Sequence, residues 1–364
     1  MSQPKTTLSP GNDGFAVPAA AAARSPYGRH VDRRTVIVVI CLSVLTLFLF
    51  CWSMTVGDFP VSFRDVITTL IGKGDSGDWF IVGELRLPRA LVGVLVGAAF
   101  GLSGALLQSI AHNPLATPDV IGVTGGASLA AVAVIVLGGG DWLAAAGGYG
   151  IPLAALVGGI GAATLVYLLA WRRGLAGYRL VLVGVGIAAA ATAGIQYLMT
   201  MATIREASQA TLWLTGSLNG RGWNHVRPVA AALAVLVPVA LATGGRLRVL
   251  GMGDDAARGL GMSVERTRLI LVGCSVGLAS LATASAGPIV FVAFVAPVVA
   301  RGLCGRGQLA LVASMLTGAA LTIGADLAAR RLFAPTELPV GLVTSMIGGP
   351  YLLFVLWRTG RAGR

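Results

Sequence analysis

The sequence predicts an all-α polytopic membrane protein with about ten transmembrane helices. Hydrophobic residues make up 55% of the 364 residues and charged residues only 12%, and the mean hydropathy is +0.81. Charge-free apolar runs recur along the chain, many with the ~20 residues that a helix needs to cross a bilayer. The 51 glycines suit helices that pack closely in lipid.

The apolar runs define the predicted spans in chain order. They are Thr35–Gly57, Ala90–Pro118, Val120–Gly140, Trp142–Trp171, Leu180–Ile204, Pro228–Gly245, Leu269–Ala300, Gly307–Ala325 and Leu338–Trp357. Leu269–Ala300 is too long for one span of ~17 to 25 residues. Gly287-Pro288 divides it, which raises the count to ten. The shorter uncharged segment Ala207–Gly220 is expected to lie at the outer interface.

The ends of the chain flank this domain of residues 35–358. Residues 1–34 carry Pro, Ser, Ala and Gly with basic residues but no apolar run, so we expect a disordered cytoplasmic tail and not a signal peptide. Residues 359–364 are a short second tail. An even number of spans places both ends on one side, and with the N-terminus inside 18 of the 27 basic residues face the cytoplasm. The positive-inside tendency favours that orientation.

A polar segment, Arg246–Arg268, interrupts the apolar pattern with eight charges. Asp254 and Ser263 are good helix N-cap types, and Gly261 suits a helix C-terminus. The segment therefore predicts a short helix over Asp255–Leu260, a glycine break, and a second helix beginning near Val264. Upstream, the pattern Thr117-Pro118-Asp119 predicts the start of the third span.

Several function classes are disfavoured. The basic residues lie at the ends of apolar runs and not in a patch with interleaved aromatic residues, so nucleic-acid binding is disfavoured. The four cysteines show no CxxC spacing and the three histidines are scattered, so no metal or catalytic site is indicated. Ile71-Gly72-Lys73-Gly74 lacks the spacing and the hydroxyl of a phosphate-binding loop. No Asp, Glu, Lys or Arg lies near the centre of a span, which disfavours an ion-coupled secondary transporter.

Rows of small residues at four-residue spacing occur in three spans. They are Gly93, Gly97 and Gly101; Gly186, Ala190 and Gly194; and Gly341, Ser345 and Gly349. Such rows permit close helix packing, which is the expected role of the first row. The second row has two interpretations, packing or the lining of a pathway.

Further motifs resemble one family. They are Leu85–Arg89, Ser103–Gln108, Asn113–Pro118, Gly125–Ser128, Gly253–Met262, Ala325–Arg330, Glu337–Gly341 and Gly348–Tyr351. Together and in this order they resemble the FecCD/BtuC-type permeases, the membrane subunits of type II ABC importers for iron-siderophores, haem and vitamin B12. Val298 stands where the family has a histidine, and the charged motif that follows is reduced to Gly305–Gly307, so no role is assigned to a histidine there.

The resemblance implies site residues at both membrane faces. The expected element for coupling to a cytoplasmic ATPase comprises Gly253, Asp254, Asp255, Ala256, Arg258, Gly259, Leu260 and Gly261. Arg86, Arg89 and Arg330 resemble arginines that receive acidic residues of a solute-binding protein, with Asp326 and Glu337 as ion-pair support for Arg330. Anchoring of the second span at the interface is the alternative for Arg86 and Arg89.

The resemblance also implies a gate, a cargo and partners. The loop Gly174–Tyr178 resembles the segment that closes the pathway, although Gly174 and Gly177 also suit a simple turn. The expected cargo is a ferric siderophore, with haem or cobalamin as alternatives. The expected partners are an ABC ATPase dimer that holds ATP and magnesium, a solute-binding protein, and a second copy or a related permease. No catalytic residue, cofactor or metal site is expected in this chain.

Overall fold

The computed structural model describes residues 33–57, 59, 61–138, 148–170, 177–305, 308–332 and 336–362, and the regular elements within these ranges are all helical. In chain order they are α1 (Arg33–Thr55), α2 (Phe63–Leu70), α3 (Ser76–Trp79), η2 (Phe80–Arg86), α4 (Leu87–Ile110), α5 (Val123–Leu137), α7 (Gly150–Ala170), α8 (Gly177–Met201), α9 (Ile204–Leu214), α10 (Trp223–Leu250), α11 (Asp254–Gly259), α12 (Val264–Ala286), α13 (Val292–Cys304), α14 (Gln308–Arg331) and α15 (Val340–Ala362).

The helices account for the predicted spans. Among the described residues, eight helices are long and apolar enough to cross a membrane, and Val123–Leu137 and Val292–Cys304 are shorter apolar helices. The prediction of about ten spans is therefore confirmed. The predicted break at Gly287-Pro288 is confirmed as well, because α12 ends at Ala286 and α13 begins at Val292.

Some helix boundaries differ from those of the predicted spans. The first helix begins at Arg33, before the predicted start at Thr35, and the last continues to Ala362, beyond the predicted end at Trp357. The third span does not start at Thr117-Pro118-Asp119: residues 118–122 form turns, and α5 begins at Val123 after Gly122. Residues 1–32 and 363–364 lie outside the described residues.

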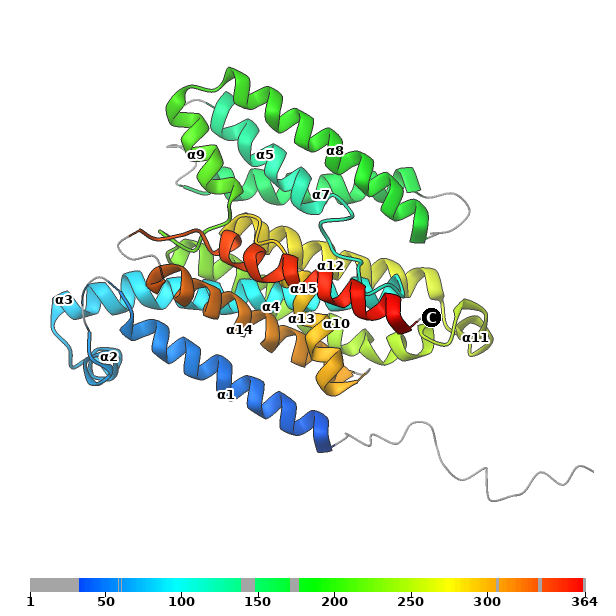
Figure 1. The fold of residues 1–364 in the computed structure, drawn as a ribbon, viewed down its shortest axis with the longest axis horizontal. Coiled ribbons are helices and arrows are strands. Elements are labelled where there is room, and N and C mark those ends of the chain that lie inside the picture. The colour runs from blue at the N-terminus through cyan, green and yellow to red at the C-terminus, as the bar shows by residue number, and fades with distance from the viewer. Residues whose placement is uncertain are drawn as a thin grey trace, which may run out of the picture.

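The helices form two groups (Figure 1). One contains α5, α7, α8 and α9, and the larger one contains α1, α4, α10 and α12–α15. Helix α12 joins the groups, because it packs against α4 and α10 on one side and against α7 and α5 on the other. The start of α1 and the end of α15 lie at the same end of the bundle as α11 (Figure 1), as an even number of crossings requires.

Helix α4 lies at the centre of the larger group, and most of its residues are buried. A Cβ at Gly97 would lie 2.4 Å from the Gly318 carbonyl oxygen, and one at Gly101 would lie 2.2 Å from the Ser314 oxygen. The backbones of α4 and α14 therefore touch, which confirms packing as the role of the row Gly93, Gly97 and Gly101. The small residues allow this close approach, which favours association in lipid.

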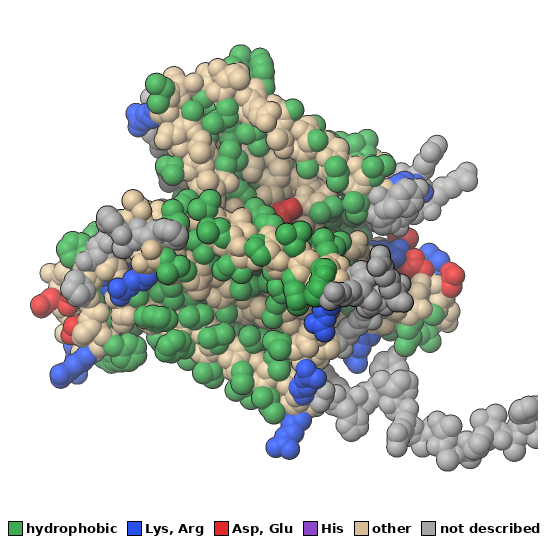
Figure 2. Space-filling view, in the orientation of Figure 1, with side chains coloured by type: hydrophobic (Ala, Val, Ile, Leu, Met, Phe, Trp, Pro, Cys, Tyr) green, Lys and Arg blue, Asp and Glu red, His purple; other side chains and the backbone are tan. Residues whose placement is uncertain are grey.

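The outer surface of the bundle suits a lipid environment. In Figure 2, hydrophobic side chains cover most of the middle of the visible face, and charged side chains gather mostly toward the two ends of the long helices. Helix α1 exposes Ile40, Val44 and Phe48, each more than half accessible. Their spacing of four residues places them on one face of the helix. Large apolar faces of this kind are expected to contact lipid.

Candidate functional site

The segment after α10 forms a short helix and a second helix, as predicted. Helix α11 covers Asp254–Gly259 and α12 begins at Val264 with Ser263 as its N-cap residue. The N-cap of α11 is Gly253, not the predicted Asp254. Gly253 has φ +101° and Gly261 has φ +78°, conformations that L side chains rarely adopt. The two glycines therefore set both ends of α11.

Ion pairs and backbone contacts hold this element in place. The Asp254 carboxylate lies 2.8 Å from the Arg268 guanidinium on α12, and Asp255 lies 3.1 Å from Arg258 within α11. Ala257 is buried, and its carbonyl oxygen accepts a hydrogen bond from the Met262 amide. The element is thus fixed to α12 and can transmit a rigid movement of a partner.

Two apolar side chains at the ends of α11 are exposed. Leu260 is 68% exposed and Met252 is 69% exposed, although both lie among charged residues. Ala256 is exposed as well, and no heavy atom lies within 4 Å of a Cβ built at Gly259. A protein partner could therefore approach the backbone closely and cover the two apolar side chains.

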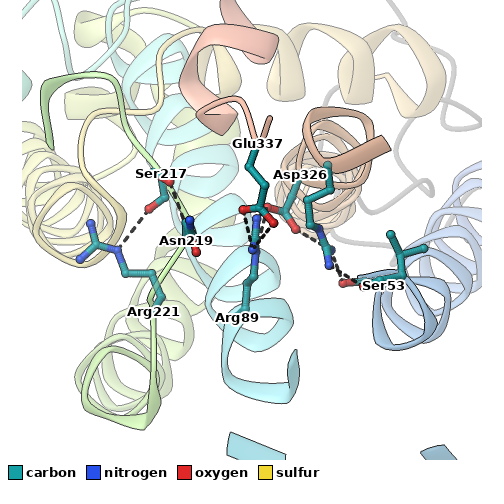
Figure 3. Close-up of polar contacts among 9 residues, drawn as sticks. Ser53, Arg89, Ser217, Asn219, Arg221, Asp326 and Glu337 are labelled. Carbon is teal, nitrogen blue, oxygen red and sulfur yellow. Dashed lines mark hydrogen bonds and ion pairs between the residues drawn. The ribbon is translucent and has the colours of Figure 1, made fainter. Parts of the chain in front are cut away.

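A charge cluster lies at the opposite end of the bundle (Figure 3). The Arg89 guanidinium on α4 lies 2.9 Å from Asp326 on α14 and 3.1 Å from Glu337. Arg330, one turn after Asp326, lies 2.6 Å from the other oxygen of the same carboxylate. The Asp326 side chain is only 2% exposed. The ion pair of Asp326 with Arg330 agrees with the prediction, but Glu337 contacts Arg89 and not Arg330.

Two arginines from different helices bind the end of α1. Arg86 donates hydrogen bonds to the carbonyl oxygens of Met54 and Phe59, and Arg330 donates to the Val56 carbonyl and the Ser53 hydroxyl. The last carbonyls of a helix have no partner within it, so these guanidiniums satisfy part of that need. Arg86 is only 7% exposed. Its burial favours an anchoring role over direct contact with a partner, and the docking role of Arg86, Arg89 and Arg330 stays a prediction.

Sequence patterns did not single out Arg221. Its Nε donates to the Ser217 carbonyl, and its guanidinium contacts the His225 ring at 3.1 Å. Figure 3 shows Arg221 and Ser217 on the same side of the bundle as Arg89 and Glu337. Burial lowers the pKa of the Arg221 guanidinium. These hydrogen bonds of Arg221 depend on the turns between α9 and α10, which no sequence motif predicted.

A second polar group that sequence reasoning did not assign to the site is Asp119, in the turns before α5. Its carboxylate accepts a hydrogen bond from the Thr124 hydroxyl. Burial raises the pKa of the Asp119 carboxyl, and the hydrogen bond from Thr124 opposes that effect. Among the described residues, no group of three or more His, Cys, Asp or Glu side chains could hold a metal ion.

The predicted gate residues lie along or near α8. Gly174 is outside the described residues, and Gly177 is the first residue of α8. Gly186 and Ala190 are exposed, and nothing lies within 4 Å of a Cβ built at Gly186. Gly194 instead faces α5, with its Cβ position 2.9 Å from Leu129. Gly194 therefore packs against α5, whereas Gly186 and Ala190 face outward from the single chain.

Comparison with known proteins is consistent across sequence and structure. A family model described as the FecCD transport family matches residues 45–358. The ferric enterobactin transport system permease protein FepG of Escherichia coli (strain K12) is 40% identical over 332 residues, covering 91% of this chain and 99% of FepG. The iron(3+)-hydroxamate import system permease protein FhuG of Bacillus subtilis (strain 168) is 36% identical, covering 89% of this chain and 98% of FhuG.

A solved structure of a metal-chelate type ABC transporter in an inward-facing conformation is also similar. It superimposes with a TM-score of 0.78 at 25% identity and covers 89% of this chain and 99% of that one. The predicted fold class, the all-α bundle of a type II ABC importer permease, is therefore confirmed.

The charge cluster generates a test of stability. Asp326→Asn removes the carboxylate that Arg89 and Arg330 share, and loss of one partner from a buried ion pair costs about 3 to 5 kcal/mol. We expect a clearly lower thermal unfolding midpoint for this variant in detergent. Glu337→Gln is the matched control, because loss of a more exposed partner costs only ~0 to 1 kcal/mol. Equal midpoints for the two variants would contradict the central position of Asp326.

Proposed function

Because the chain belongs to the FecCD transport family, we propose that it is the membrane permease subunit of an ATP-driven importer that carries a ferric siderophore into the cytoplasm. ATP and magnesium bind to a separate ABC ATPase dimer in this proposal. The chain supplies the pathway through the membrane and the element on which the ATPase acts. It performs no catalytic step of its own.

The coupling element α11 carries this proposal. It is fixed to α12 by the ion pair of Asp254 with Arg268. Leu260 at its C-terminal end and Met252 just before it are exposed. Apolar side chains in a charged, water-facing segment are typical of a protein interface. A groove on the ATPase covers them, and movement of the ATPase displaces α11 and α12 together.

The orientation follows from the same element. The end of the bundle with α11 faces the cytoplasm, where the ATPase is, and the end with the Arg89 cluster faces outward. Both described chain ends lie on the α11 side (Figure 1), so N- and C-termini are cytoplasmic in a plasma or inner membrane. The excess of basic residues at that end supports this orientation.

The solute-binding protein docks on the outward end. Arg86 and Arg330 bind the end of α1, so their main contribution is to shape this surface. The cations available to acidic residues of a partner are exposed side chains on the same end, namely Arg64, Lys73, Arg205, Arg227 and Arg331. Arg89 forms an ion pair with the exposed Glu337. It can join these cations by releasing Glu337 and pairing with an acidic residue of the binding protein.

The pathway lies between two permease subunits. Much of α8 is exposed in the single chain, with Gly186 and Ala190 on that face, and a second copy or a related permease covers it. Small residues there leave room for a bulky cargo that makes few specific contacts. The loop at Gly174 and Gly177 closes the cytoplasmic end of the pathway.

Relatives support the cargo class. The names of similar permeases refer to enterobactin, hydroxamate and achromobactin systems as well as to iron citrate. Haem or cobalamin is the alternative cargo within the same family. A stand-alone secondary transporter is a different class. It is disfavoured because Asp326 and Arg86, two buried charged residues, lie near span ends and serve internal contacts.

Leu260→Asp tests the coupling proposal. Burial of a leucine side chain contributes ~1.5 to 3 kcal/mol, so the variant is expected to retain the ATPase at least about tenfold less during co-purification. Because Leu260 is exposed, stability should change by no more than ~0.5 kcal/mol. The measurement is the amount of ATPase bound to tagged permease, together with uptake by intact cells.

Leu332→Asp is the control for that variant. Leu332 is 72% exposed and lies at the opposite end of the bundle, so its replacement should leave ATPase binding unchanged. Normal ATPase retention by Leu260→Asp, or an equal loss in Leu332→Asp, would contradict the assignment of α11 as the coupling element.

Uptake by a deletion strain tests the cargo. Cells that lack this chain should lose uptake of one labelled ferric siderophore among catecholate, hydroxamate and citrate complexes, and should grow poorly under iron limitation. Reintroduction of the chain should restore both. Selective loss of haem or cobalamin uptake would favour the alternative cargo, and unchanged uptake of every compound would refute the proposal.

A further inference from the structure

A cavity opens beside the base of the coupling element. It has a volume of about 400 Å³ and lies among the ends of α4, α10, α13 and the start of α14, where its walls include Arg248, Arg301, His112, Asn113, Gln108 and Met252. Its size falls within the ~300 to 1,000 Å³ of small-molecule sites. Met252 is shared with the proposed ATPase interface, whereas the other lining residues belong neither to that interface nor to the cluster of Arg89, Asp326 and Glu337.

The walls carry basic and polar side chains among apolar ones. Arg301, in the last turn of α13, contacts the Gln108 carboxamide oxygen, and Gln108 in turn donates to the Phe294 carbonyl. The Arg301 side chain is therefore held at the wall. Arg248 is exposed in the last turn of α10. The described residues that line the cavity include no Asp or Glu.

Two further polar residues line the cavity. His112 Nε2 donates a hydrogen bond to the Leu250 carbonyl oxygen at 3.2 Å, so this N–H is already used within the chain. His112 also has a positive φ of 50°, a conformation uncommon for residues other than glycine and often found at ligand sites. Asn113 Oδ1 accepts from the Leu115 amide, which turns its amide nitrogen toward other partners.

The helix ends do not cancel the positive charge. Helices α4, α10 and α13 end near the cavity and α14 begins there. With about half an elementary charge at each helix terminus, these ends contribute roughly one net negative charge. The guanidiniums of Arg248 and Arg301 contribute two positive charges, so the cavity stays attractive to an anion.

We propose that this cavity binds a phosphate-bearing anion, either the headgroup of an anionic phospholipid or soluble phosphate. Guanidinium groups match phosphate oxygens in geometry and charge. Span ends lie at the depth of lipid headgroups, and basic pockets between transmembrane helices bind anionic headgroups on the cytoplasmic side. That the cavity faces the cytoplasm rests on the proposed function.

Occupancy has a consequence for the coupling element. Arg248 and Met252 lie just before α11, whereas Arg301 belongs to α13 and Gln108 to α4. An anion bound by both arginines joins the base of α11 to the central helices. The bound anion thus stiffens the connection through which a movement of α11 reaches the bundle.

Native mass spectrometry of the purified full-length chain in neutral detergent tests the proposal. The probes are phosphatidylglycerol, phosphatidylcholine and inorganic phosphate. We expect phosphatidylglycerol to bind at least about tenfold more tightly than phosphatidylcholine. Arg248→Gln should remove most of that preference, and so should Arg301→Gln. Competition by millimolar inorganic phosphate would identify a soluble anion as the ligand, and lack of competition would identify the lipid headgroup.

Arg246→Gln is the matched control, because Arg246 lies two residues from Arg248 on the exposed part of α10 but does not line the cavity. Equal binding of the two lipids together with no bound inorganic phosphate, or an equal loss of preference in Arg246→Gln and Arg248→Gln, would overturn the proposal. Because Arg248 is exposed, its replacement should not prevent folding. The readout involves neither ATP nor transport, so its failure is distinct from failure of the proposed function.

Discussion

The direct contact between the backbones of α4 and α14 determines much of the architecture. A Cβ at Gly318 would lie 2.1 Å from the Gly97 carbonyl oxygen, so only glycine fits at this crossing. In lipid, the acyl chains are as apolar as the helix surfaces, so no hydrophobic effect drives helices together. They associate instead through such close packing. The contact places Arg89 of α4 beside Asp326 of α14, although the two residues are 237 positions apart.

Helix α4 runs between the two ends of the bundle that carry the candidate sites. Its first turn carries Arg89, which pairs with Asp326 and Glu337, and its last turns carry Gln108, which contacts Arg301 at the cavity near α11. In the middle of α4, Gly97, Gly101 and Gly104 lie directly against the backbones of α14 and α13. In the proposed coupling mechanism, α11 and α12 move relative to this closely packed helix.

Local signals in the sequence predicted the features that local chemistry determines. The short helix α11, the glycine break and the start of α12 were predicted from Asp254, Gly261 and Ser263, although the N-cap of α11 is Gly253, and the spans follow from their apolar length. Tertiary contacts determine the rest. Glu337 pairs with Arg89 because α4 and α14 meet, and Arg86 binds carbonyls at the end of α1. The start of α5 at Val123 depends on turns buried between helices.

The thermal unfolding midpoint of Gly318→Ala, compared with that of Gly324→Ala in the same helix, tests the importance of the α4–α14 crossing. At Gly324 a new Cβ would meet its nearest neighbour, a Leu49 methyl group, at 3.9 Å, so that variant should unfold at or above the midpoint of the unmodified chain. Gly318→Ala must separate the helices, at a cost of at least about 1 to 3 kcal/mol, and should unfold at a clearly lower temperature. Equal midpoints for the two variants would contradict the account.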